Sequence, residues 1–259
     1  MIPPNLLILN YHKIESRTDI GITTRHPDDF RKDLKTLVQK GYQTVNFYDL
    51  KKPEQLPEKP VIITFDDAYL SFYESAFKIL KEHKMKAVVF VPVNFINKKN
   101  EWDVQLFGKK YRHMSEDQLR EISENNIEIG SHTLNHKYLN DLQDHELVKE
   151  LELSKTKLES IVGKNIISIS YPFGKFNNRV LQFARKYYDF DVGLLPSFFQ
   201  NSNSLRPFER INIYRIDSQK DFQKKLEYKK YPGLKAKNRL IQFGSWATIL
   251  LKKLQVQNG

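Results

Sequence analysis

The sequence predicts an α/β protein with a mostly parallel sheet, built either as a (β/α) barrel or as an open doubly wound sheet. Short apolar runs alternate along the chain with stretches of helical periodicity, as in parallel strands joined by helices. The chain has 259 residues, a length that suits one barrel-like domain. Polar residues follow several of the apolar runs, at the C-terminal strand ends where the active-site residues of a barrel lie.

The first half of the chain supplies four expected strands and two expected helices. The strands are residues 6–11, 42–47, 61–65 and 86–92. One helix is expected over residues 27–41, where Gly41 ends the periodic pattern, and another over residues 69–83. The apolar face of the first helix comprises Phe30, Leu34, Leu37 and Val38.

The second half continues the same alternation. A helix is expected over residues 115–126, because Ser115 and Gln118 have the spacing of a capping box. The remaining strands are residues 127–132, 166–172, 190–195 and 210–216. The remaining helices are residues 144–163 and 177–188.

The composition limits the chemistry and the expected location. The chain has no cysteine, which excludes disulfides and thiolate ligands, so a metal ion would have to be held by histidine, aspartate or glutamate. The N-terminal stretch MIPPNLLILNYH lacks the features of a signal peptide, and its apolar run is too short to span a membrane. We therefore expect a cytoplasmic protein.

The net charge of +11 is concentrated near the C-terminus, where residues 228–259 contain basic but no acidic side chains. We expect a catalytic barrel over residues 1–230 and a basic amphipathic helix over residues 231–259. That helix would either pack on the barrel or lie on an anionic membrane surface, on its inner face. Nucleic acid is not an expected partner, because no recognition motif accompanies the basic residues.

Two adjacent acids follow an apolar run in the stretch TFDDAY. Asp66 and Asp67 would suit a simple turn or a helix cap, but polar groups end neighbouring strands in the same way. Those groups are residues 10–12, 131–132 and 171–172. In a barrel the carboxyl ends of the strands face one another, so we expect these residues to meet.

The stretch SHTLNH contains His132 and His136, whose spacing can bring two imidazoles to one metal ion. With Asp67 they would complete a site of two histidines and one carboxylate, which leaves positions open for water and substrate. Asp66 would then accept a proton from the water that the metal acidifies. Zinc suits this ligand set, and cobalt, nickel, manganese and iron are compatible with it.

Residues 5–215 resemble the polysaccharide deacetylases of carbohydrate esterase family 4. TFDDAY resembles the family's TFDDG motif, with Ala68 in place of the glycine, and SHTLNH resembles its H-[ST]-x-x-H motif. SYPFG is similar to the third motif, which usually reads R-x-P-[FY]-G. The stretches LNYHKIE and PDDFRKDLKTLVQKGYQTV resemble the branch that includes the exopolysaccharide poly-N-acetylglucosamine deacetylases.

The resemblance implies a distorted (β/α) barrel that removes N-acetyl groups from amino sugars with the help of a divalent metal. It assigns Asp66 as the base. The metal ligands that it implies are Asp67, His132 and His136. It also implies that the backbone N–H of Phe173 stabilises the oxyanion, on a loop that Tyr171 and Pro172 shape.

Three departures from the family pattern affect the site. Ser170 stands where many members have an arginine that tethers the base, and Arg210 would supply that charge from another strand unless it is only structural. The family's usual catalytic acid is a histidine near the end of the barrel, but no histidine follows His145. His12 is the best substitute for protonating the leaving amine, with protonated Asp66 or water as alternatives. The fourth motif is not recognisable.

The predicted function is metal-dependent removal of an N-acetyl group from an amino sugar of a bacterial surface glycan or its precursor. One alternative is a deacetylase or deformylase of an isoprenyl-phosphate-linked sugar at the membrane surface. The other is a catalytically weak carbohydrate-binding relative, against which the retained Asp66 argues. Surface positions are expected for the remaining histidines, His26, His83, His113 and His145.

Overall fold

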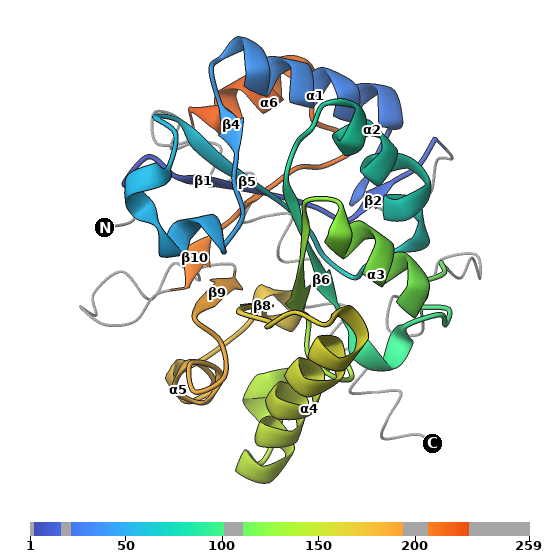
Figure 1. The fold of residues 1–259 in the computed structure, drawn as a ribbon, viewed down its shortest axis with the longest axis vertical. Helices are drawn as coiled ribbons and strands as arrows, with labels where there is room; N and C mark the ends of the chain where they lie inside the picture. Colours follow the sequence, from blue (N-terminus) through green and yellow to red (C-terminus); the bar gives the residue numbers. More distant parts are fainter. Residues whose placement is uncertain (1–2, 17–21, 101–110, 194–206, 228–259) are drawn as a thin grey trace.

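Parallel strands occupy the middle of the molecule and helices lie around them (Figure 1). The computed structural model describes residues 3–16, 22–100, 111–193 and 207–227. The predicted helix over residues 231–259 and the predicted domain boundary at residue 230 lie outside these ranges.

One sheet of nine strands, all paired in parallel, forms the core of the described chain. Its order is β10-β9-β8-β7-β6-β5-β1-β11, with β4 also beside β5. The strands are β1 (Leu7–Tyr11), β4 (Gln43–Thr44), β5 (Pro60–Phe65), β6 (Ala87–Val91), β7 (Ile127–Ser131), β8 (Ser168–Ser170), β9 (Phe190–Gly193), β10 (Phe208–Glu209) and β11 (Ile211–Asn212). A separate parallel pair comprises β2 (Lys13–Ile14) and β3 (Thr24–Arg25).

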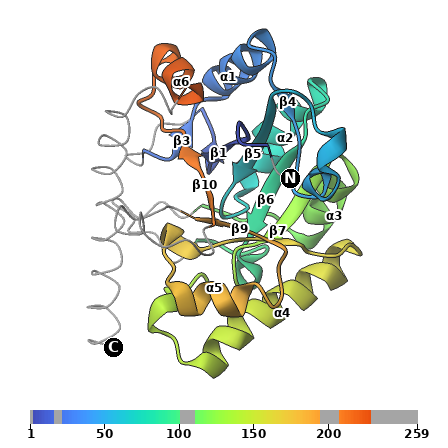
Figure 2. The ribbon, with the colours of Figure 1, turned by 90° about the vertical axis from the view of Figure 1, so that its left-hand side faces the viewer.

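The helices cover the outside of this sheet. They are α1 (Pro27–Gln39), α2 (Phe77–Glu82), α3 (Glu116–Glu124), α4 (Asp144–Val162), α5 (Asn178–Ala184) and α6 (Gln219–Leu226). A π-helical turn (Phe72–Ala76) leads into α2, where the sequence predicted one continuous helix. Helices α1 and α6 pack together at one end of the molecule, and α4 and α5 pack together at the other (Figure 2). Among the described residues, no helix is both long and apolar enough to cross a bilayer.

The sheet curls round until its two edges are joined by one short stretch of chain. Strand β10 pairs with β9, and β11 pairs with β1 at the other edge, yet Arg210 is the single residue that separates β10 from β11. The result is a nearly closed, distorted barrel, which confirms the barrel and excludes the open doubly wound sheet. Arg210 lies at the seam.

The two faces of the strands pack into different cores. On β5, Val61, Ile63 and Phe65 belong to the larger core beneath the helices, whereas Ile62 belongs to a smaller core inside the barrel. Because side chains alternate along a strand, the position after Phe65 faces the interior. Asp66 therefore points into the interior of the barrel.

Local signals in the sequence explain where several helices begin and end. Ser115 accepts a hydrogen bond from the backbone of Gln118 and the capping box is complete, as predicted. Gly163 ends α4 in the left-handed conformation, with φ of 66°. The prediction for Val38 was wrong, because this side chain is 57% exposed. Leu37 takes the position facing the core, and the next residue of a helix points about 100° away.

Glu128 is a buried carboxyl group near the start of β7. Its Oε2 accepts hydrogen bonds from the backbone N–H groups of Phe47 (2.8 Å) and Tyr48 (3.3 Å), and its Oε1 accepts one from the Ser168 hydroxyl (2.7 Å). Burial raises the pKa of Glu128 to about 7, and these hydrogen bonds offset only part of that effect. The folded protein therefore keeps a proton on Glu128 that the unfolded chain, with a pKa of 4.5, releases earlier.

The contribution of Glu128 to the stability of the protein should therefore fall as the pH rises towards 7. Between the two pKa values the folded state binds more protons, so the contribution of Glu128 is complete below pH 4.5 and is lost as the pH passes 7. The lost free energy of unfolding is on the order of 3 kcal/mol. Glu128→Gln should remove this pH dependence, because an amide can make the hydrogen bonds of the protonated acid.

Urea unfolding of the metal-free protein, from about pH 5 to about pH 8, measures this effect. The stability of wild type relative to the glutamine variant should fall over this range, because both proteins share the titration of the buried histidines and differ only at residue 128. Equal pH dependence in both proteins would show that Glu128 is ionised in the folded state.

Candidate active site

Three loops that follow β5, β7 and β8 form the candidate site. Each contains non-glycine residues with positive φ, a conformation that such residues seldom adopt outside functional or tightly constrained positions. These residues are Asp67 (72°), Ala68 (49°), Thr133 (68°), His136 (51°) and Phe173 (59°). Strained backbone is thus concentrated in the loops where the sequence predicted the chemistry.

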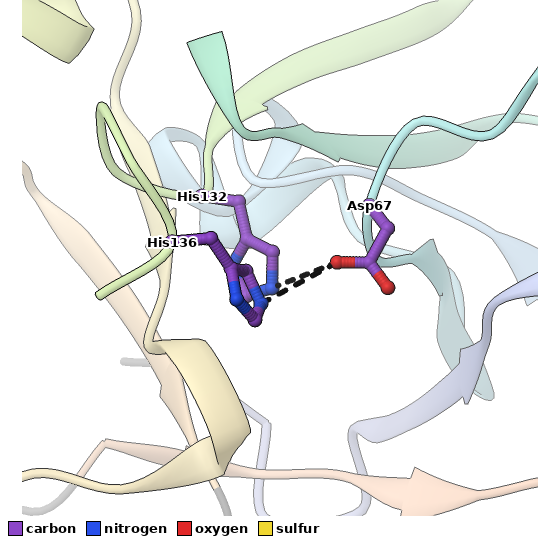
Figure 3. Close-up of side chains that lie close together, drawn as sticks. All are labelled: Asp67, His132 and His136. Carbon is purple, nitrogen blue, oxygen red and sulfur yellow. Dashed lines mark ion pairs between the residues drawn. The ribbon is translucent and has the colours of Figure 1, made fainter. Parts of the chain in front are cut away.

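The side chains of Asp67, His132 and His136 point towards one another across two of these loops (Figure 3). All three are buried, and one ligand atom from each lies within 4.8 Å of the others. Asp67 Oδ1 lies 3.6 Å from Nε2 of His132 and 3.5 Å from Nε2 of His136. The structure therefore brings together the three residues that the sequence predicted as metal ligands.

The geometry of this group fits a divalent metal. Its distances of 3.5 and 3.6 Å are longer than a normal hydrogen bond, whereas two ligands about 2.1 Å from a tetrahedral zinc ion lie about 3.4 Å apart. His132 Nδ1 is 2.7 Å from the carbonyl oxygen of Ser170, so Nδ1 carries the proton and leaves the Nε2 lone pair for an ion. Burial lowers the pKa of His132, which favours this neutral form.

Asp66 is buried beside Asp67, His132 and His136, which we call the metal-binding group for the ion that they are proposed to hold, and it forms a bidentate ion pair with Arg210. Nη1 of Arg210 lies 2.7 Å from Oδ1, and Nη2 lies 2.8 Å from Oδ2. Nη2 also donates to the hydroxyl of Ser170 at 3.0 Å. Ser170, which stands where many members of the family have an arginine, therefore accepts a hydrogen bond from Arg210.

Asn10, near the end of β1, completes the surroundings of Asp66. Its Nδ2 donates to Oδ2 of Asp66 at 3.2 Å, and its Oδ1 accepts from Nη1 of Arg210 at 2.9 Å. Burial alone would raise the pKa of Asp66, but the Arg210 guanidinium more than offsets burial and holds the pKa below its ordinary value. Asp66 is therefore a carboxylate at neutral pH.

His12, predicted as the catalytic acid, is half-buried and interacts electrostatically with Asp66, Arg210 and His132. Burial lowers its pKa to about 4, although the Asp66 carboxylate opposes the shift. The imidazole is therefore uncharged at neutral pH. The structure places His12 near the candidate base, and its role as the acid remains a prediction.

The third motif lies against the metal-binding group through Phe173. The Phe173 ring is 4.8 Å from the His136 ring, measured between centroids. Pro172 is buried and begins a single helical turn, Pro172–Gly174. The Tyr171 hydroxyl donates to Asp191 at 3.1 Å, a contact that anchors the turn to β9. The role of the Phe173 backbone N–H in stabilising the oxyanion stays a prediction.

Sequence reasoning missed Asn10 and was wrong about His113. It included Asn10 only as a polar residue at a strand end, although the side chain contacts both Asp66 and Arg210. His113 was expected at the surface but is 4% exposed, and its ring contacts the backbone of Asp67. The polar stretch that contains His113 gave no signal of burial.

Comparisons with known proteins identify the family of the chain. The family model described as polysaccharide deacetylase matches residues 54–188. YxkH of Bacillus subtilis, whose name places it among the polysaccharide deacetylases, is 30% identical over 216 residues, covering 82% of this chain and 72% of YxkH. Poly-beta-1,6-N-acetyl-D-glucosamine N-deacetylase of Staphylococcus aureus is 25% identical over 198 residues, covering 70% of this chain and 68% of that protein.

A solved structure has a similar fold. The deacetylase PplD of Streptococcus pyogenes, in complex with acetate, matches with a TM-score of 0.71 and 25% identity, over 85% of this chain and 97% of PplD. The family match includes Asp66 and the metal-binding group but ends before Arg210, which lies outside residues 54–188. The resemblance predicted from the motifs is confirmed: the chain belongs to the polysaccharide deacetylase family.

Proposed function

We propose that this protein is a metal-dependent hydrolase that removes an N-acetyl group from an amino sugar of a bacterial surface glycan or its precursor. The observation that carries the proposal is the ion pair of Asp66 with Arg210 beside the metal-binding group. A protein that only bound sugar would need no ionised carboxylate in this position. The name of the Staphylococcus aureus relative supports an N-acetylglucosamine polymer as the substrate class.

The residues of the site divide the reaction between them. Asp67, His132 and His136 would hold the metal, which supplies Lewis acidity that acidifies water and polarises the amide carbonyl. Asp66 accepts the proton of the attacking water, while Arg210 keeps the carboxylate ionised and oriented. The C–N bond then breaks, and acetate and a free amine leave.

Two further roles complete the proposed reaction. The backbone N–H of Phe173 donates to the oxyanion, on the turn shaped by Tyr171 and Pro172. His12 protonates the leaving amine. Because burial lowers its pKa to about 4, His12 is neutral at rest, and the proton that it delivers is the one that Asp66 has taken from the water and passes to it. If His12 is structural, the protonated Asp66 returns its own proton to the amine.

A lipid-linked amino sugar is the second candidate substrate. The basic composition of residues 228–259 supports it, because anionic lipid attracts such a segment. The protein would then bind peripherally to the inner face of the membrane. A deformylase acting on the same lipid-linked sugar would use the same residues and would release formate.

Assays of released acid should distinguish these substrates. Protein loaded with zinc, and in parallel with cobalt, nickel, manganese or iron, is incubated with an N-acetylglucosamine oligomer or with an isoprenyl-phosphate-linked N-acetyl amino sugar. We expect acetate from the oligomer, which would identify a polymer deacetylase. Acetate from the lipid-linked sugar alone would favour the second candidate and would involve the basic tail in substrate access. Release from neither substrate with any ion would contradict the proposed function.

A further inference from the structure

Backbone hydrogen bonds join the two loops that carry the proposed metal ligands. Residues 93–100 begin beside the loop of His132 and His136, where the N–H groups of Val93 and Asn94 donate to its carbonyls at 3.1 and 2.9 Å. The same segment then pairs with a second stretch, residues 111–114, through bonds of 2.7 to 2.9 Å. The histidine loop is thus connected to residues 111–114.

Residues 111–114 in turn pair with the loop that carries Asp67. The N–H of Met114 donates to the carbonyl of Ala68 at 3.0 Å, and the N–H of Leu70 donates to the carbonyl of Arg112 at 2.8 Å. We call residues 93–100 and 111–114 the brace. The brace forms a continuous hydrogen-bonded connection between the aspartate loop and the histidine loop.

One brace side chain reaches the backbone of a proposed metal ligand. Nδ1 of His113 lies 2.6 Å from the carbonyl oxygen of Asp67. A carbonyl can only accept, so Nδ1 carries the proton and donates it. The His113 ring stacks on Tyr69, with centroids 5.0 Å apart and 23° between the planes, and the Phe95 ring lies 5.9 Å away. Both rings fix the direction in which Nδ1 points.

We propose that His113 is a positioning residue for the metal site. Its ring Nδ1–H holds the Asp67 peptide in the conformation that directs the Asp67 carboxylate towards His132 and His136. Asp67 and Ala68 are consecutive left-handed residues, with φ of 72° and 49°. This conformation is unfavourable for a residue with a side chain, so the surrounding contacts must hold the turn. Ala68 replaces the glycine that would adopt this conformation without strain.

The hydrogen bond and the ring packing of His113 can be separated by mutation. His113→Phe keeps an aromatic ring between Tyr69 and Phe95 but removes the donor. His113→Asn loses the ring but can present an N–H at the same number of bonds from the backbone as Nδ1. His145→Phe is the matched control, because His145 is exposed and lies outside the brace.

The measurement is the Kd for zinc and for cobalt, by competition with a chromophoric chelator on the full-length chain. This proposal rests on the metal site of the proposed function. His113→Phe should weaken binding by about tenfold to a hundredfold, as loss of partners that orient metal ligands does. His113→Asn should recover most of the affinity, and His145→Phe should match wild type. Circular dichroism and thermal unfolding without metal report whether each variant is folded.

The possible results separate this proposal from the proposed function. Wild-type affinity in a folded His113→Phe would overturn the role of His113 and leave the metal site intact. Equal weakening in folded His113→Phe and His113→Asn would show that the ring, not the N–H, matters, and would also overturn it. Failure of wild type to bind any metal would overturn the metal site itself, and this proposal with it.

Discussion

Asp66→Asn is expected to lower the rate of acetate release by a factor of about 10² to 10⁴, the usual contribution of a general base. The asparagine side chain has nearly the same size but cannot accept a proton from water at neutral pH. The three residues of the metal-binding group are unchanged, so metal affinity should stay close to that of wild type. Acetate release and chelator competition, measured on the same preparation, check both expectations.

The same variant distinguishes an enzyme from a carbohydrate-binding relative. A binding protein would keep its affinity for N-acetylglucosamine oligomers and would show no turnover to lose. Turnover that survives the substitution would overturn the assignment of Asp66 as base. Loss of metal binding together with turnover would instead show that the variant disturbs the neighbouring Asp67.

Arg210→Met is expected to lower the free energy of unfolding by about 3–5 kcal/mol, because it leaves the buried Asp66 carboxylate without its partner. The Arg210 side chain is 1% exposed and that of Asp66 is 7% exposed, so water cannot replace the guanidinium. Activity should also fall sharply, since each oxygen of the base loses its guanidinium donor and only the weaker contact from Asn10 remains. Urea unfolding and acetate assays measure the two effects.

A double-mutant cycle tests the reason for that instability. In Asp66→Asn with Arg210→Met the uncompensated negative charge is gone, so the double variant should be more stable than Arg210→Met alone. If the two substitutions are simply additive in free energy, the ion pair does not account for the loss. The cycle thus separates the charge of Asp66 from the packing of the long arginine side chain.

The sequence was most informative where the chemistry is local. Asp66 and Asp67 are adjacent, and His132 and His136 share one short loop, so their residue types and spacing were enough to predict the group that meets in the structure. The alternation of strands and helices indicated a parallel sheet but could not decide between a barrel and an open sheet. That choice depends on how β10 and β11 join opposite edges, which no local pattern records.

Contacts between distant segments limited the rest of the prediction. Arg210 was considered only because Ser170 occupies the position of the family's arginine, and 144 residues separate Arg210 from Asp66. His113 was assigned to the surface because its neighbours are polar. Its burial comes from Tyr69 and Phe95, whose positions the sequence around His113 does not reveal.

The position of Arg210 at the seam of the barrel has a consequence for how the protein is made. Synthesis delivers Asp66 long before Arg210, and at about 5–20 residues per second the interval is roughly 7 to 30 seconds. During this time the newly made carboxylate has no guanidinium partner. The pairing forms only when β10 docks onto β9 and β11 onto β1. Translation order thus couples the onset of hydrolytic competence to completion of the barrel, so incomplete chains released from the ribosome would lack an oriented base.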